Sequence, residues 1–157
     1  MIAAAALSGF LLAPAAGAGT AYGAVTTPDQ KAVLATVRQF IDGINGDFNK
    51  ALAVCASPAI IIDEFAPHVW RGATACADWY DAFNADAGKH GITDSVVTLG
   101  TPWHVDITGG TAYVVSTANY TYKQSGKPVS EIGSVFTVAL VKAAAGWRVT
   151  GWAWAKH

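Results

Sequence analysis

Charge is scarce in this sequence. Only 13% of its 157 residues are charged, the formal net charge at pH 7 is −1, and hydrophobic residues make up 52%. This composition excludes a disordered chain and indicates a well-filled core or a pocket with apolar walls. Basic residues are not in excess, so we expect no nucleic-acid partner. The length suits one domain.

The motifs of several kinds of site are also missing. The sequence has no G-x-S-x-G elbow and no Gly-rich phosphate loop after a strand, which leaves nucleophilic catalysis without support. The four histidines, His68, His90, His104 and His157, lack the spacing of zinc ligands. We therefore expect neither a metal nor a cofactor.

The first 24 residues contain no charged side chain at all. They are too short and too weakly apolar for a convincing membrane span. An apolar stretch from Ile2 to Leu12 followed by small residues is typical of a secretory signal peptide, although no basic residue precedes Lys31. We expect residues 1–24 to be this peptide, and the mature protein to be secreted or periplasmic with no membrane span. A disordered tail is the alternative.

Only two cysteines are present, Cys55 and Cys76. An even count in an exported chain predicts a disulfide, which here closes a loop of about twenty residues and stabilises the fold by roughly 3 kcal/mol. Two buried free thiols are the alternative.

Three helices are predicted in the first part of the chain. Thr27, Pro28 and Gln30 form the start signal of a helix that ends near Asn45, because a T-x-x-Q capping box surrounds a proline at the first helical position. A short helix over residues 48–55 follows, and Pro58 stops it. A third helix is expected within residues 73–91, with Gly88 and Gly91 at its end.

Strand patterns occupy the rest. A short strand pair is expected at residues 60–65 and 70–71, and the β-branched and aromatic runs after residue 95 predict a four-strand antiparallel meander. Helices segregated from a meander predict an α+β fold, with three helices packed on one face of a curved antiparallel sheet. Residues 27–157 are assigned to a single domain.

The order and spacing of these segments resemble the nuclear transport factor 2-like superfamily. The stretches that carry the resemblance are "VRQFIDGINGDFNKALAVCASPAIIIDEF", "WRGATACADWYDAF" and "GWRVTGWAWAKH". This superfamily includes ketosteroid isomerases and SnoaL-like cyclases. The resemblance implies a cone-shaped fold with a pocket at its wide end, which binds a small apolar molecule, and a homodimer formed through the outer sheet face. It does not settle the function, because this fold hosts unrelated activities.

Asp63 is the main catalytic candidate. It ends a run of three isoleucines, and burial in apolar surroundings raises the pKa of a carboxyl group towards the value that a general base needs. The resemblance places the isomerases' catalytic base at this position. A non-catalytic pocket group and a structural acid are the alternatives. Asp63 and Glu64 point to opposite faces of a strand, so one of them should face inward.

The other parts of the isomerase machinery are altered. Gln39 stands where the resemblance implies an oxyanion-binding tyrosine, and "SVFTVALV" lacks the expected second acid. His68 is the second catalytic candidate, as an acid–base group or a gate; a solvent-facing turn histidine is the alternative. The remaining pocket candidates are polar or aromatic side chains: Trp70, Trp79, Trp103, Asn119 and Trp152.

Three functions fit these observations. The first is an enzyme of the isomerase or cyclase kind, in which Asp63 transfers a proton. The second is a non-catalytic exported protein that binds a small apolar ligand, and the third is a dimeric interaction module. An enzyme needs at least two polar groups that converge on one apolar pocket, which the structure can test.

Overall fold

The computed structural model describes residues 27–157, and the expected signal peptide lies outside them. Helix α1 (Pro28–Asn45) begins and ends as predicted, because Thr27 and Gln30 form the reciprocal hydrogen bonds of a capping box. Its buried face includes Val33, Val37 and Phe40. This face packs on the sheet and supplies much of the core.

Six strands form one sheet in the order β2-β1-β6-β5-β4-β3. The predicted meander is confirmed, since β3, β4, β5 and β6 pair antiparallel with their neighbours in sequence. The strands are β1 (Cys55–Ile62), β2 (Val69–Gly72), β3 (Ile92–Thr108), β4 (Thr111–Gln124), β5 (Lys127–Ala143) and β6 (Gly146–Ala155).

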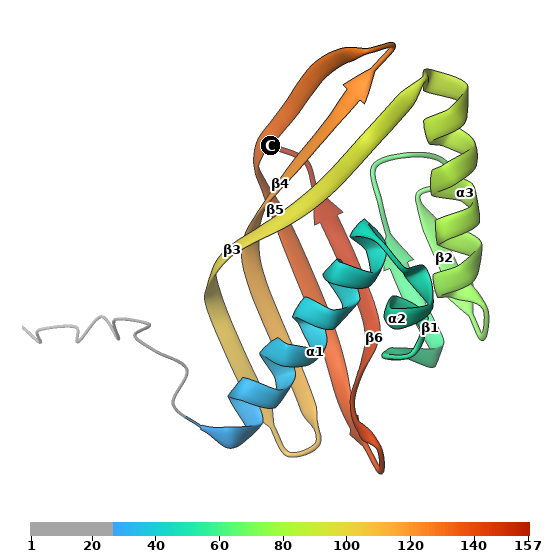
Figure 1. Ribbon diagram of the computed structural model, residues 1–157. Helices are drawn as coiled ribbons and strands as arrows, with labels where there is room; N and C mark the ends of the chain where they lie inside the picture. The colour runs from blue at the N-terminus through green and yellow to red at the C-terminus, as the bar shows by residue number, and fades with distance from the viewer. Residues whose placement is uncertain (1–26) are drawn as a thin grey trace, which may run out of the picture.

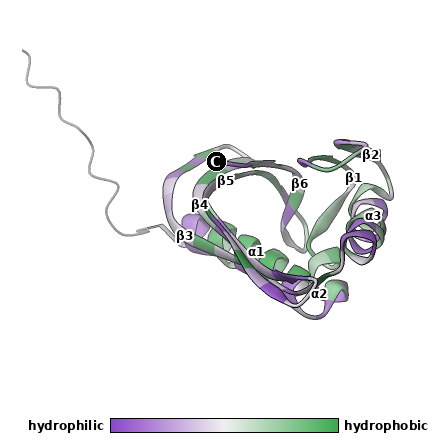
Figure 2. Cartoon of the chain, turned by 90° about the horizontal axis from the view of Figure 1, so that it is seen from above, coloured by the Kyte–Doolittle hydropathy of each residue, from purple (hydrophilic) through white to green (hydrophobic). Residues whose placement is uncertain are grey.

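The sheet is strongly curved, and the helices lie on its concave side. Figure 1 shows α1 crossing the long strands, with the short α2 (Phe48–Leu52) at its end. Helix α3 (Ala75–His90) packs beside β1 and β2 at the other side of the molecule. Seen from above, the sheet bends into an arc around the helices (Figure 2). The predicted α+β cone is confirmed.

The segment after α2 differs from the prediction. The helix ends at Leu52 and not at Cys55, and the strand begins at Cys55 and not at residue 60, because the amide of Val149 on β6 donates to the carbonyl of Val54 at 2.8 Å and starts a parallel ladder there. The sheet is therefore mixed and not wholly antiparallel. Pro58 is tolerated inside β1 because it lies in the register shift between Cys55 and Ile60, where no ladder amide is required.

Helix α3 lies within the predicted range, but only one of the two glycines expected at its end terminates it. Gly88 lies inside it, and Gly91 alone terminates it in the left-handed conformation, at φ 64°. Glycine is favoured there because it has no Cβ to clash with the backbone.

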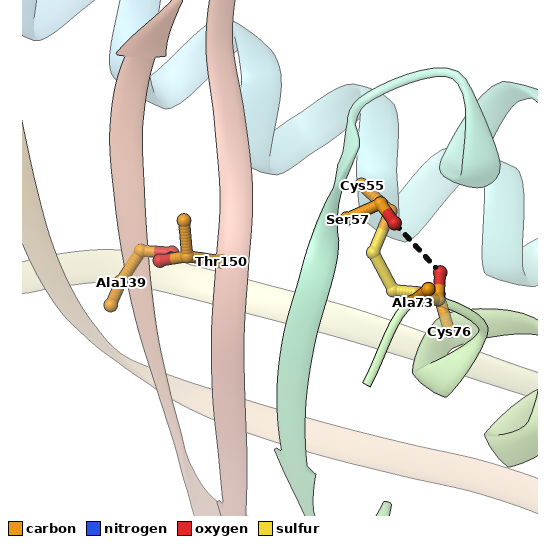
Figure 3. The surroundings of a disulfide bond; sticks show 6 residues. All are labelled: Cys55, Ser57, Ala73, Cys76, Ala139 and Thr150. Carbon is orange, nitrogen blue, oxygen red and sulfur yellow. Dashed lines mark hydrogen bonds between the residues drawn. A yellow bond between two sulfur atoms is a disulfide. The ribbon is translucent and has the colours of Figure 1, made fainter. Parts of the chain in front are cut away.

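The predicted disulfide between Cys55 and Cys76 is confirmed. It joins the start of β1 to the first turn of α3 (Figure 3). A second link lies beside it, where the Ser57 hydroxyl donates to the carbonyl of Ala73 at 3.0 Å. The two links fix α3 against the strand whose far end carries Asp63.

The parallel pairing of β1 and β6 depends on a glycine. A Cβ atom at Gly151 would lie 2.6 Å from the carbonyl oxygen of Ile60, which is backbone and cannot move alone. We predict that Gly151→Ala lowers the free energy of unfolding by about 1–3 kcal/mol through overpacking. Urea denaturation measures this change. Gly110→Ala is the control, since a Cβ there meets nothing within 4 Å. Equal effects of the two substitutions would contradict the prediction.

Candidate functional site

A cavity of about 80 Å³ lies between α1, α3 and the concave face of the sheet. Most of its wall is apolar, and the polar exceptions are the carboxylates of Asp63 and Glu64 and the ring substituents of tyrosine and tryptophan. The residues that line it are Ile41, Ile44, Asp63, Glu64, Phe65, Trp79, Phe83, Val97, Tyr120, Phe136, Trp152 and Trp154. An apolar cavity with a few polar groups is the usual form of a small-molecule site.

The alternation of β1 directs Asp63 inward. Ile61 is fully buried, whereas Ile60 and Ile62 are about half exposed, so the next inward position falls at residue 63. Two hydrogen bonds then fix the carboxylate. The indole N–H of Trp79 donates to Oδ2 at 2.8 Å, and the backbone N–H of Glu64 donates to Oδ1 at 2.7 Å. Asp63, and not Glu64, is therefore the more deeply placed acid.

Burial dominates the electrostatics of Asp63. Loss of water around the carboxylate raises its pKa to about 6, and the hydrogen bonds from Trp79 and Glu64 oppose that rise. The negative charges of Glu64 and Glu131 raise it further. A carboxyl group with this pKa is mostly ionised at neutral pH and is a stronger base than an exposed aspartate.

Trp79 connects the carboxylate to the helix and to the aromatic wall. It lies one turn after Cys76 on α3, so the disulfide holds its backbone close to β1. Its ring stacks on Phe83 with centroids 5.6 Å apart and meets Trp152 edge to face at 4.8 Å. These contacts leave the indole little freedom to turn away from Asp63.

Tyr120 on β4 adds a second polar group to the cavity. Burial raises the pKa of its hydroxyl to about 12, against the opposing effect of the Ser95 side chain, and the charge of Asp63 adds to the rise. The phenol is thus neutral and able to donate a hydrogen bond at physiological pH. Its oxygen is buried and has no hydrogen-bond partner of good geometry among the described residues.

A polar cluster lies at the edge of the cavity. The Lys156 ammonium donates to Glu131 at 2.7 Å and lies 3.4 Å from Glu64. The Tyr122 hydroxyl also donates to Glu131, at 3.2 Å. This cluster links the end of β6 to β4, to β5 and to the loop after β1. The hydrogen bond to Glu131 is the main reason that the pKa of Lys156 is raised.

Four of the residues predicted from the sequence meet in the cavity: Asp63, Glu64, Trp79 and Trp152. Trp70 is buried but packs behind the wall, against Phe65 at 5.0 Å.

Three other candidates do not line the cavity. Gln39 lies on the exposed side of α1 and donates to the carbonyl of Lys50 at 3.3 Å. Asn119 accepts a hydrogen bond from the amide of Gly133 at 3.0 Å, next to the bulge between β4 and β5. Trp103 is 51% exposed. Their direct contact with a ligand in this cavity has no support.

His68 lies near Asp63 but on its backbone side. Its ring Nδ1 is 3.3 Å from the carbonyl oxygen of Asp63, and its own carbonyl accepts from the Asp63 amide at 3.0 Å. The imidazole is exposed and is not among the residues that line the cavity. This placement supports a structural role in the loop after β1, and an acid–base role for His68 stays a prediction.

Several lining residues were missed from the sequence, and Tyr120 is the most important. Asn119 was the pocket candidate chosen on β4 in its place. Period-2 alternation does contain the correct signal, because Ala112, Val114, Ser116 and Ala118 are all buried and residue 120 continues that series. Residue 119 belongs to the opposite series.

The structure resembles several solved structures. A candidate dehydratase of the NTF2-like family from Streptomyces avermitilis superposes with a TM-score of 0.68 and 18% identity, over 82% of this chain and 96% of that one. A candidate ketosteroid isomerase from Shewanella frigidimarina gives 0.60 and 23%, over 77% and 92%. The S. rosetta CaMKII hub gives 0.66 and 20%, over 85% and 100%. This chain has the nuclear transport factor 2-like fold.

Sequence comparison alone does not reach this result. No protein-family model matches the sequence, and no curated protein matches it. At identities of 13–23% the structural neighbours show a shared NTF2-like fold and not a shared activity.

The outer face of this NTF2-like sheet carries exposed apolar side chains. Ile60 and Ile62 of β1 point away from the core, as does Tyr113 of β4, which is 45% exposed. Homodimer formation through this face stays a prediction. Within residues 27–157, no helix is long and apolar enough to cross a membrane, and no group of three His, Cys, Asp or Glu side chains could hold a metal ion.

The hydrogen bond from Trp79 stabilises the ionised form of Asp63. We predict that Trp79→Phe raises the Asp63 pKa above about 6, by a further one unit or so, because a hydrogen bond to a charged group is worth about 1.5–3 kcal/mol. Carboxyl ¹³C NMR titration measures the pKa. Trp154→Phe is the control, since it also lines the cavity but has no hydrogen bond to Asp63. Equal shifts in both variants would show that lost ring volume, and not the N–H donor, is responsible.

Proposed function

We propose that the cavity binds a small, mostly apolar carbonyl compound and that Asp63 removes a proton from the carbon next to its carbonyl group. The observation that carries this proposal is the position of the Asp63 carboxylate. It is held by two hydrogen bonds in the wall of an aromatic cavity, where burial brings its pKa to about 6. The candidate isomerase and dehydratase among the structural neighbours are consistent with such chemistry.

The hydrogen bonds leave Asp63 able to act as a base. Each carboxylate oxygen has two lone pairs, and Trp79 and Glu64 occupy one on each oxygen. One acceptor site therefore remains on either oxygen for a substrate proton. The two donors also fix the carboxylate's orientation, which lowers the cost of reaching a productive geometry.

A non-catalytic binding protein is the second candidate function. It is favoured by the altered isomerase machinery, because Gln39 lies outside the cavity and His68 faces the backbone of Asp63. The two candidates differ in one measurable property, since only an enzyme accelerates proton exchange in a bound molecule.

Asp63→Asn provides the test of catalysis. Cyclohexanone is the probe, and deuterium incorporation next to its carbonyl in D₂O is followed by NMR. We predict that the wild-type protein accelerates this exchange and that Asp63→Asn lowers the acceleration by about 10²–10⁴-fold, the usual contribution of a general base. The wild-type rate should rise with pH through about 6, because the base must be ionised. Binding without exchange above the buffer rate would favour the non-catalytic protein.

We also propose that the protein is exported, as residues 1–24 suggest. The disulfide between Cys55 and Cys76 supports this proposal, because such bonds persist mainly in oxidising compartments. When the chain is expressed in a secreting bacterial host, we expect a shortened mature protein whose cysteines resist alkylation until a reductant is added. Intact mass measures both properties. A protein that still begins at Met1 would contradict export.

A further inference from the structure

Two buried hydrogen-bond donors in the cavity wall lack an acceptor. The Tyr120 hydroxyl and the Trp152 indole N–H are both shielded from water, and neither makes a hydrogen bond of good geometry among the described residues. The Ser95 side chain acts on the Tyr120 hydroxyl and lowers its pKa, but it does not form such a bond. A buried donor without a partner costs about 1–3 kcal/mol, so folded proteins rarely leave one without a reason. Two in one small cavity point to a missing acceptor.

The other buried polar atoms without partners in residues 27–157 belong to residues outside the cavity wall. Those others are Glu131 Oε2, Ser134 Oγ and the indole N–H of Trp147, and none of their residues lines the cavity. Tyr120 and Trp152 do line it, from β4 and β6 respectively. A ligand in the cavity therefore contacts both residues.

The two side chains also lie close to Asp63. The Trp152 ring meets the Trp79 ring at 4.8 Å, and the Trp79 indole N–H binds Asp63. Tyr120 lines the same cavity as Asp63, whose charge is the smallest of the causes that act on the pKa of the Tyr120 hydroxyl. An oxygen atom held by these donors thus lies beside the proposed base.

We propose that the Tyr120 hydroxyl and the Trp152 indole N–H together form the subsite for an acceptor oxygen of the ligand, most simply a carbonyl oxygen. The inference rests on the proposed function, since it requires a ligand in this cavity, and it adds the groups that recognise the ligand. An indole N–H can only donate, and a neutral phenol can donate to a carbonyl. The acceptors in the cavity wall are the carboxylates of Asp63 and Glu64, and neither of them bonds to these two donors. The ligand must therefore supply the oxygen atom that accepts from the donors.

The same donors would support proton removal by Asp63. When a proton leaves the carbon next to a carbonyl, its electron pair moves onto the carbonyl oxygen, which becomes an enolate oxygen, and Asp63 becomes protonated. Hydrogen bonds from fixed donors strengthen as that negative charge develops. Return of the proton to another carbon would complete an isomerisation without any further reactant.

The size of the cavity limits the ligand. Its volume of about 80 Å³ is below the roughly 150 Å³ of an engineered cavity that binds benzene. The aromatic wall must therefore open by a small amount even for one six-membered ring. Such a movement would also uncover the two donors, which are now buried.

A pair of matched probes tests the subsite by binding alone. Cyclohexanone carries the acceptor oxygen, and methylenecyclohexane has the same shape with a CH₂ group in its place. In ¹⁵N-labelled protein we expect cyclohexanone to bind at least about tenfold more tightly. It should move the Trp152 indole proton downfield, as a new hydrogen bond does. The Trp147 indole, which is also buried but lies outside the cavity, should not respond to either probe.

Tyr120→Phe removes one donor and keeps the ring. We expect it to weaken cyclohexanone binding by about tenfold and to leave methylenecyclohexane binding unchanged. Tyr122→Phe, which removes a hydroxyl bonded to Glu131 and not facing the cavity, should change neither. Equal affinity of wild type and Tyr120→Phe for the ketone, or an unmoved Trp152 proton in the complex, overturns the subsite and leaves the binding pocket intact. Failure of both probes to bind contradicts the proposed pocket, and the subsite with it.

Discussion

The hydrogen bond between the Trp79 indole and the Asp63 carboxylate is the interaction on which the site depends. It fixes α3 against the end of β1, and it gives the charge of Asp63 a hydrogen-bond donor within an apolar cavity wall. Desolvation still outweighs the two hydrogen bonds, so the pKa of Asp63 rises to about 6. At neutral pH the raised pKa of Asp63 lowers the free energy of unfolding, because the same carboxyl group ionises more easily in the unfolded chain. This loss of stability disappears as the pH falls from about 6 towards about 4, where the carboxyl group becomes protonated in the folded protein. Retaining such a group is more easily explained by function than by folding.

The hydrogen bond is possible because several constraints converge on the same strand. The disulfide fixes the start of β1 to α3, three residues before Trp79. The parallel pairing of β1 with β6 fixes the other half of the strand, and Gly151 lets the two backbones approach. Because β6 also carries Trp152 and Trp154 into the cavity, the same pairing sets the position of the aromatic wall relative to Asp63.

The sequence predicted the parts of this arrangement that depend on local patterns. The capping box at Thr27 and the meander follow from short-range rules, whereas alternation along the strand predicted only that one of Asp63 and Glu64 faces inward. The predicted helix ran three residues too far, to Cys55, and the strand was expected only from residue 60, because the strand structure of residues 55–59 depends on β6, which is almost a hundred residues away. Gln39 was misplaced for a similar reason: a resemblance gives the position along a helix, whereas the packing of α1 on α2 decides which side of the helix faces the cavity. The alternation of inward and outward residues along β4 could have identified Tyr120 as a lining residue. It could not have shown that its hydroxyl has no hydrogen-bond partner of good geometry.

The polar groups of the cavity provide the strongest argument against a purely structural reading of Asp63. A carboxylate with vacant lone pairs and a tyrosine hydroxyl without an acceptor of good geometry line the same small cavity, yet they do not bond to each other. Folding alone would gain from pairing them, since each buried group left unsatisfied costs free energy. A molecule that presents an acidic C–H bond to Asp63 and an oxygen to Tyr120 and Trp152 would satisfy both sides at once. The arrangement is therefore better suited to a ligand that lies between these groups than to an empty core.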